Sequence, residues 1–278
     1  MNLRGDTRPS APPAARPPIV LVVLGALGAA VFVVPLLALV VKAPWSSIGD
    51  VFGAEETRQA LVLSLVTSLC AAAIAIVLGV PLAWVLARTR LPGRRLIRAV
   101  CTLSMVLPPV VAGVALFLAV GRRGLLGGVL DDWFGVTLPF SMPGVVLAQV
   151  FVAMPFLVLT VDAAIEQLDP RYEHAARTLG ASEWYVFRRV VVPAVRPALI
   201  AGAVLTWARA LGEFGATIPF AGSLPGVTRT MPLEAYLALE TDADRAVLLS
   251  LTLVAVSFTV LFGLRSRWIG AVTQGAHR

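Results

Sequence analysis

Long apolar runs alternate along the chain with short connections that carry most of its charged residues. A helix needs about 20 mostly apolar residues to cross the hydrocarbon core of a bilayer. Runs of that kind lie at residues 19–41, 59–87, 96–120, 143–165, 197–220 and 246–264. The pattern therefore predicts an all-α integral membrane protein with about six transmembrane helices.

Four prolines fall within these runs: Pro81, Pro108, Pro109 and Pro155. A bundle of helices can satisfy the backbone groups that a proline frees, and the resulting kinks can shape a pathway. Proline that is merely tolerated in a lipid-facing helix is the other interpretation, and both stay open for each position.

The two ends of the chain lie outside the long apolar runs. Residues 1–18 are rich in proline and arginine with few large apolar side chains, which predicts a disordered tail. The run at 19–41 is too long for the apolar part of a signal peptide and no cleavage site closes it, so we expect the first transmembrane helix there. Residues 265–278 are expected to form a cytoplasmic C-terminal tail.

Composition agrees with a membrane protein and limits the partners. Hydrophobic residues make up 58% of the chain and charged residues 14%, with a mean hydropathy of +0.86, whereas soluble domains carry roughly 25% charged residues. The net charge of +7 comes from arginines that gather in alternate connections, above all in 88–98 and 171–196. Such a bias places these connections and both termini in the cytoplasm. It explains the charge without nucleic acid as a partner, and leaves lipid as the surrounding medium.

Signatures of enzymes are missing from the sequence. It contains no G-x-x-x-x-G-K-[ST] run for binding ATP and no H-E-x-x-H zinc motif. Cys70 and Cys101 lack metal-ligand spacing to each other or to His174 and His277. We therefore expect no catalytic residue, no metal site and no cofactor in this chain. A secondary transporter is disfavoured because the hydropathy shows no paired repeat.

The connection at 166–196 carries the start and stop signals of two short helices. Asp169 and Pro170 predict a helix start, and Gly180 predicts its left-handed end. Ser182 can cap a second helix that Pro193 would end. The expected apolar face of the first helix consists of Tyr172, Ala175, Ala176 and Leu179, and that of the second of Trp184, Phe187 and Val191. Such a hairpin could dock a partner, or it could rest on lipid and neighbouring helices.

The same connection resembles the EAA loop of ABC importer permeases. The similarity lies in Glu173, Ala175, Ala176, Gly180, Ala181, Ser182, Phe187, Val190 and Pro193. In that family the loop forms coupling helices that dock into a groove on a cytoplasmic ATPase. His174 stands where the family's acid most often precedes the alanines, so Glu173 is one residue early. The resemblance assigns ATPase coupling to Glu173, His174, Ala175, Ala176, Gly180, Ala181 and Ser182.

Similarity to the family continues over most of the chain and implies a type I permease domain at 57–264. The run LGVPLAWVLART at 78–89 resembles the end of the family's second span, and LPPVVAGVALF at 107–117 resembles its third. The stretch at 208–240, with T-R-T-x-P-L-x-x-Y from Thr228 to Tyr236, is most similar to molybdate permeases. Sulfate permeases share its G-E-F-G element, so sulfate and tungstate remain alternatives.

Two charged residues are expected inside the membrane. Arg209 and Glu213 lie four residues apart and hence on one helix face. Ionisable groups at that depth usually face the bundle interior or a water-filled cavity. They would lie on a translocation pathway with Phe214 and Thr217, or would form a structural ion pair. Phe214 and Phe220 would narrow that pathway or simply pack. Arg122, Arg123 and Arg229 would attract an anion outside or only set the topology.

The resemblance implies an assembly in the cytoplasmic membrane that works by alternating access. Its expected members are a second permease copy, two cytoplasmic P-loop ATPase subunits that use ATP and Mg²⁺, and an extracytoplasmic anion-binding protein.

Overall fold

The computed structural model describes residues 18–275, with side chains described for all of these except 261 and 264–275. The expected tail at 1–18 therefore lies outside the described residues apart from Pro18. Every regular element in the described range is a helix. The helices are α1 (Ile19–Lys42), η1 (Trp45–Ser47), α2 (Ile48–Gly53), α3 (Glu55–Arg88), α4 (Arg94–Val106), α5 (Pro109–Val120), α6 (Gly127–Phe134), α7 (Met142–Gln167), α8 (Arg171–Thr178), α9 (Glu183–Val186), η2 (Phe187–Val191), α10 (Val192–Ala194), α11 (Arg196–Leu211), α12 (Thr217–Ala221), α13 (Met231–Thr241) and α14 (Ala243–Gly275).

The chain divides into two compact units, the first ending at Ala43 and the second beginning at Pro44. The first unit contains α1, which is 24 residues long and has no buried residue. Its apolar window has a mean hydropathy of 2.8, and its bounds agree with the expected first transmembrane helix. The remaining helices belong to the second unit.

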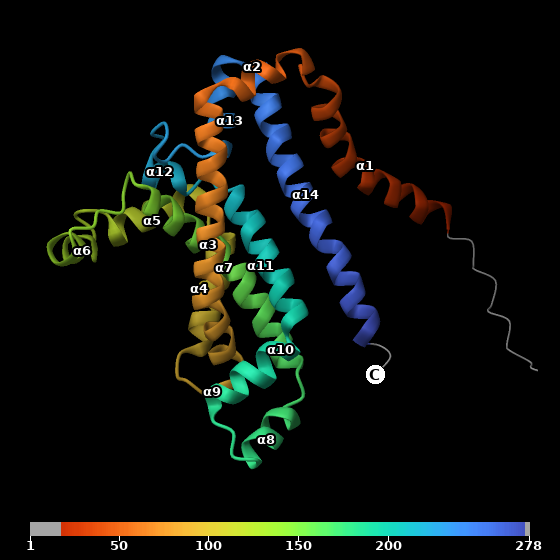
Figure 1. Ribbon diagram of the computed structural model, residues 1–278, viewed down its shortest axis with the longest axis vertical. Helices are drawn as coiled ribbons and strands as arrows, with labels where there is room; N and C mark the ends of the chain where they lie inside the picture. The colour runs from red at the N-terminus through yellow and green to blue at the C-terminus, as the bar shows by residue number, and fades with distance from the viewer. Residues whose placement is uncertain (1–17, 276–278) are drawn as a thin grey trace, which may run out of the picture. The chain divides into compact units, whose positions relative to one another are not determined.

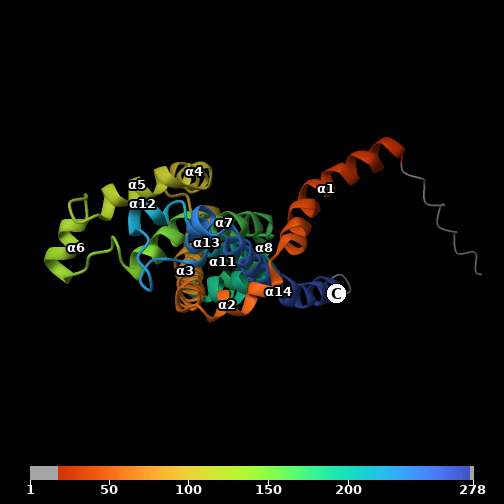
Figure 2. The same cartoon turned by 90° about the horizontal axis from the view of Figure 1, so that it is seen from above.

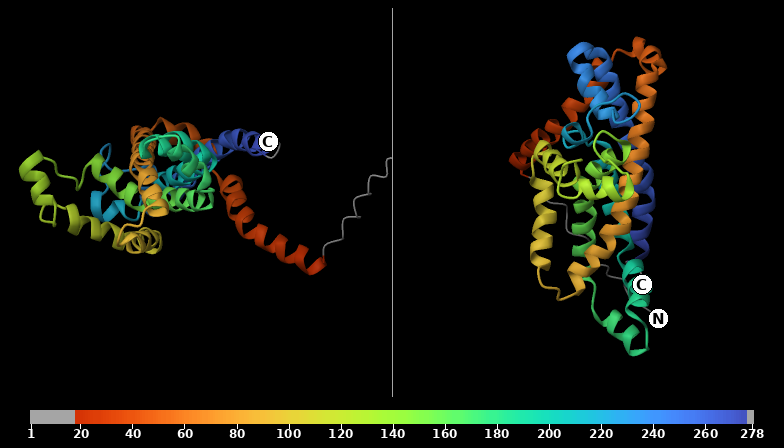
Figure 3. Two further views of the ribbon diagram at one scale, coloured as in Figure 1. Left: turned by 90° about the horizontal axis from the view of Figure 1, so that it is seen from below. Right: turned by 90° about the vertical axis from the view of Figure 1, so that its left-hand side faces the viewer.

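Helices α3, α7 and α11 pack against one another and form the centre of the second unit (Figures 1 and 3). Small residues allow this close approach, which is how helices associate where lipid removes the hydrophobic driving force. A Cβ atom at Gly79 of α3 would lie 3.2 Å from Val158 of α7, and one at Gly202 of α11 would lie 3.0 Å from Leu157. The glycines therefore set the spacing of the three helices.

Four helices within the described residues are long and apolar enough to cross a membrane. The number rises to five if the segments Glu183–Ala194 and Arg196–Leu211, which meet at a bend of 77°, count as one span. The unbroken ones are α1, α3, α7 and the first part of α14, at Ala243–Val260. Together with the helical form of the other apolar runs, this confirms the all-α membrane fold. Helix α14 continues to Gly275 and so extends past the expected start of the C-terminal tail at 265.

The third expected span, at 96–120, is two helices rather than one. Helix α4 ends at Val106, and Leu107 and Pro108 both have extended ψ angles, of 134° and 131°. Proline disfavours helical backbone in the residue before it and has no N–H to donate, so consecutive prolines stop the helix. Pro109 then occupies the first position of α5, where its missing N–H is not needed.

The fifth expected span, at 197–220, is also interrupted. Helix α11 ends at Leu211, residues 212–216 are not helical, and α12 begins at Thr217. Helix α12 packs against α5 and α7, so α5, α6 and α12 lie together on one side of the central helices (Figures 1 and 2). Helix α13 and the start of α14 lie at the opposite end of α3 from α8 and α9 (Figure 1).

Candidate functional site

The connection between α7 and α11 has the local structure that its sequence predicts. Asp169 Oδ1 accepts a hydrogen bond of 2.9 Å from the backbone N–H of Arg171, at the start of α8. Gly180 ends that helix with a φ of +85°, which favours glycine. Ser182 Oγ accepts from the backbone N–H of Tyr185 at 3.3 Å and caps α9. The two expected helix starts and the glycine stop are confirmed.

The second half of the connection differs from the expected single helix. Helix α9 continues into the π-helical segment η2 and then the short α10. This helical run ends at Ala194, directly after Pro193, as the sequence predicts, and the chain then bends by 77° into α11. Phe187 packs edge-on against Trp84 of α3 and lies beside Trp184, with ring centroids 5.7 and 5.6 Å apart.

One side of α8 is open and apolar. Tyr172, Ala175 and Leu179 are exposed, Leu179 to 88%, and they belong to the face that periodicity predicts. Ala176 instead packs against the buried core at the end of α3 and α7, together with Ala181. His174 is exposed too. The open side of α8 is therefore a small apolar surface carried at one end of the helical bundle.

Glu173 points away from that surface, into the protein. Its side chain is 2% exposed, and its two carboxylate oxygens pair with Arg88 of α3 at 2.6 Å and with Arg177 of α8 at 3.3 Å. Arg177 also binds Glu183 of α9 at 2.6 Å, and this hydrogen bond raises the pKa of Arg177. The sequence predicts a coupling role for Glu173 but does not reveal its partners. Arg88 lies in the run at 78–89 that resembles the second span of ABC importer permeases.

The expected pair Arg209 and Glu213 does form. Arg209 Nη2 lies 2.6 Å from Glu213 Oε2. Glu213 Oε1 accepts the backbone N–H of Ala216 at 2.7 Å, so the same carboxylate also holds the turn between α11 and α12. The Glu213 side chain is 2% exposed and that of Arg209 is 30% exposed. The arginine is thus the more exposed member of the pair.

Glycines pack this turn tightly against α5. A Cβ atom at Gly215 would lie 2.5 Å from Cβ of Pro109, and one at Gly113 would lie 2.3 Å from Pro219. Contacts that short leave no room for a side chain unless neighbouring atoms shift. The G-E-F-G element therefore serves close packing as well as charge.

The other expected pathway residues are distributed unevenly. Phe214 is partly exposed and stacks on Tyr236 of α13, with centroids 5.6 Å apart. Thr217 is fully buried, and its hydroxyl has no hydrogen-bond partner in the structure. Phe220 is fully buried among apolar residues of α5 and α7. The structure brings Arg209 and Glu213 together and places Thr217 and Phe220 inside the fold.

A further charged cluster lies at the α13 end of the bundle. Glu234 is buried and pairs with Arg245 of α14 at 2.7 Å and with Arg229 at 3.5 Å. Arg245 also reaches Thr57 of α3 at 3.4 Å. Arg229, expected as an outer arginine, is therefore engaged in an ion pair, and Arg122 pairs with Asp131 at 3.1 Å.

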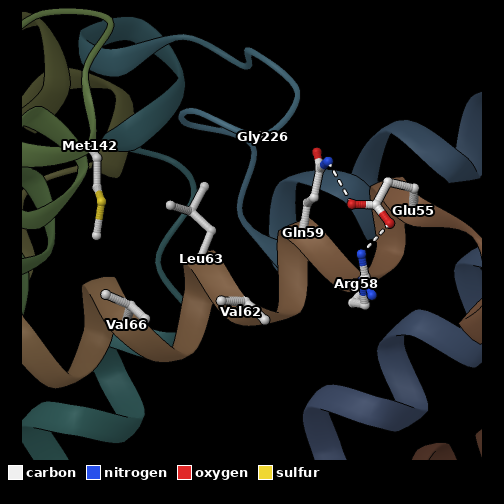
Figure 4. Close-up of a pocket in the computed structure, with 8 residues that line it drawn as sticks. All are labelled: Glu55, Arg58, Gln59, Val62, Leu63, Val66, Met142 and Gly226. Carbon is white, nitrogen blue, oxygen red and sulfur yellow. Dashed lines mark hydrogen bonds and ion pairs between the residues drawn. The ribbon is translucent and has the colours of Figure 1, made fainter.

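A cavity of about 500 Å³ opens beside the same end of α3 (Figure 4). Glu55 accepts hydrogen bonds from Arg58 and Gln59 at its polar end, and the other lining residues are Val62, Leu63, Val66, Met142 and Gly226. Among the described residues no group of three or more His, Cys, Asp or Glu could hold a metal ion.

Comparison with known proteins identifies the family. Residues 75–272 match the family described as binding-protein-dependent transport system inner membrane component. The molybdenum transport system permease protein ModB of Mycobacterium tuberculosis is 44% identical over 88% of this chain and 93% of its own. The sulfate transport system permease protein CysW of Synechocystis is 40% identical over 75% of this chain and 76% of its own.

A solved structure has the same fold. A bacterial ABC transporter involved in the import of the acidic polysaccharide alginate aligns with a TM-score of 0.74 at 15% identity, over 90% of this chain and 94% of that chain. The fold, the loop carrying α8 and the sequence matches agree, and the chain belongs to the family of binding-protein-dependent transport system inner membrane components.

Proposed function

We propose that this chain is the permease subunit of an ATP-driven importer that carries molybdate across the cytoplasmic membrane. The observation that carries the proposal is the similarity over 88% of the chain to a permease named for molybdenum transport. The molybdate-like stretch at 208–240 lies within that similarity and contributes the Arg209–Glu213 pair and α13. Sulfate is the second candidate, because the relative from Synechocystis is named for sulfate, and tungstate is a third.

The proposed assembly places two ATPase subunits against two copies of this chain, with an extracytoplasmic binding protein on the other side. The exposed apolar face of α8 supports the ATPase contact, since an apolar patch rimmed by polar residues is typical of a docking surface. ATP and Mg²⁺ would be used by the ATPase, and this chain would bind no cofactor. Both termini would be cytoplasmic, on the side of the arginine-rich connections.

Transport in the proposed mechanism is alternating access. Closure of the ATPase pair would move α8, and the helices would open outward to receive the anion. Arg209, partly exposed and held by Glu213, would attract the oxyanion along the pathway. Because Glu213 neutralises part of its charge, the arginine would bind the anion weakly enough to release it.

Purification of the tagged permease together with its co-expressed ATPase and binding protein tests the proposal. We expect a complex with two permease copies and two ATPase subunits, in which molybdate-loaded binding protein stimulates ATP hydrolysis. A permease that retains no ATPase would contradict the importer assignment. Equal stimulation by sulfate-loaded and molybdate-loaded binding protein would contradict the preference for molybdate.

A further inference from the structure

Glu173 is a buried acid on a helix whose opposite side is exposed. Both of its carboxylate oxygens are bound within the chain, one by Arg88 at 2.6 Å and the other by Arg177 at 3.3 Å. No carboxylate oxygen is left open toward the exposed face of α8. Glu173 therefore binds residues of its own chain and links α8 to α3.

Arg88 joins three parts of the chain at the last residue of α3. Its Nε atom donates to Glu173 of α8, and its Nη2 atom donates at 2.9 Å to the carbonyl of Leu168, just after α7. The backbone of α8 otherwise packs against α9 and η2, and Ala176 gives it an apolar contact with the core. The Arg88–Glu173 ion pair is thus a short, buried, charge-assisted hydrogen bond that connects α8 to the long membrane helix α3.

Helix α3 extends from this ion pair to the far end of the bundle (Figure 1). Its 34 residues span about 50 Å. Near its other end, Ser64 accepts a hydrogen bond of 2.7 Å from the backbone N–H of Met231 at the start of α13. Thr57 accepts one of 3.4 Å from Arg245 of α14. If α3 moves together with α8, the displacement therefore reaches α13 and α14 through these two hydrogen bonds.

We infer that Arg88 and Glu173 form a positioning pair that makes α8 and α3 move as one body, and that Glu173 does not contact the ATPase. The inference rests on the proposed function, because it concerns how movement of the ATPase reaches the transport pathway. The exposed face of α8, with Tyr172, Ala175 and Leu179, makes the partner contact. The buried pair transmits the movement to α3, which carries it to the outer end.

The test measures two quantities in the complete transporter: ATPase retained on purification, and anions transported per ATP hydrolysed. The variants are Glu173→Gln, Arg88→Gln and the double variant. Glu183→Gln is the matched control, because it removes an exposed acid that also binds Arg177. Arg88→Lys keeps the positive charge and is the conservative variant.

Each single glutamine variant is expected to retain ATPase within about twofold of the unmodified protein. The number of anions transported per ATP should fall about tenfold. The double variant should be no worse than the poorer single one, since both residues act through one interaction. Glu183→Gln should leave the ratio unchanged, and Arg88→Lys should restore much of it.

Three results would overturn the inference: additive losses in the double variant, an unchanged ratio in it, or loss of ATPase from Glu173→Gln but not from Arg88→Gln. The double variant leaves no unpaired charge buried, so it remains a usable test if a single variant fails to fold. Failure of the proposed function would look different, because the unmodified complex would then neither retain ATPase nor transport.

Discussion

Each buried acid among the described residues has an arginine against it. Asp162 pairs with Arg98 at 2.8 Å, and Glu173, Glu213 and Glu234 pair with arginines as described above. Removing one member of a buried ion pair leaves an uncompensated charge, which costs far more than the pair itself contributes. The arginines are therefore structural requirements of the fold, whatever else they do.

Variants of the Arg209–Glu213 pair can distinguish an effect on stability from an effect on transport. Arg209→Ala leaves Glu213 buried without its partner and should lower the free energy of unfolding by about 3 kcal/mol. Adding Glu213→Gln should recover much of this loss, because the buried charge is then gone. Thermal unfolding of the detergent-solubilised protein measures both effects. If the stable double variant transports at the unmodified rate, Arg209 has no role in the pathway.

The contact between α5 and α12 gives a second prediction. Gly113→Ala places a methyl group 2.3 Å from Pro219 and should destabilise the protein by about 1–3 kcal/mol through overpacking. Gly128→Ala on α6 is the matched control, since its new methyl group meets nothing within 4 Å. Thermal unfolding of the two variants compares them. Equal stability would show that α5 and α12 can separate at little cost.

The connection at 166–196 shows which parts of an element can be predicted from its sequence. Its cap residues and its glycine stop depend on hydrogen bonds within a few residues, so Asp169, Gly180 and Ser182 were predicted correctly. The inward direction of Glu173 depends on Arg88, which is 85 positions away in the sequence. A contact of that range leaves no local signal.

The breaks in two expected spans differ in how clearly the sequence indicates them. In the sequence, the consecutive prolines at 108 and 109 indicate a kink. In the structure the helix is fully interrupted there, between α4 and α5. The break after α11 has a weaker signal, because it depends on Glu213 capping Ala216 and on Gly215 packing against Pro109. Hydrophobic length alone therefore predicted the membrane fold but not where its helices are interrupted.

The exposed face of α8 carries the prediction of ATPase docking. Ala175→Arg should reduce the ATPase that co-purifies by about tenfold or more, because a large charged side chain replaces a small one at the contact. Ala175→Ser keeps the residue small and should bind normally. Quantification of ATPase in the purified complex checks both, and normal retention by Ala175→Arg would place the contact elsewhere.

The angle between α8 and α9 depends on Gly180. Gly180→Ala should strain the backbone by about 1 kcal/mol at a φ of +85°, and no neighbouring atom would touch the new methyl group. Gly180→Asn should be milder, because asparagine tolerates this conformation. Transport per ATP in the complete complex distinguishes the variants. Identical behaviour of alanine and asparagine would show that the left-handed turn does not matter for coupling.

At the scale of the whole molecule, the second unit has a different kind of interaction at each end of α3. One end carries the α8 surface and its buried ion pair, and the other carries the Glu234 cluster and the start of α13. The membrane interior between them is joined mainly by small residues and hydroxyl groups, such as Thr67, which accepts a hydrogen bond from Gln149. The proposed coupling uses this arrangement, with movement received at the α8 end and packing changed at the α13 end.

Uptake of radiolabelled molybdate into proteoliposomes tests the central claim most directly. The vesicles would contain this permease and its ATPase, with ATP on the ATPase side and the binding protein on the other. Accumulation should require all three proteins and ATP, and excess sulfate should reduce it much less than excess unlabelled molybdate. Uptake by the purified chain alone, driven by an ion gradient without ATPase or ATP, would contradict the account.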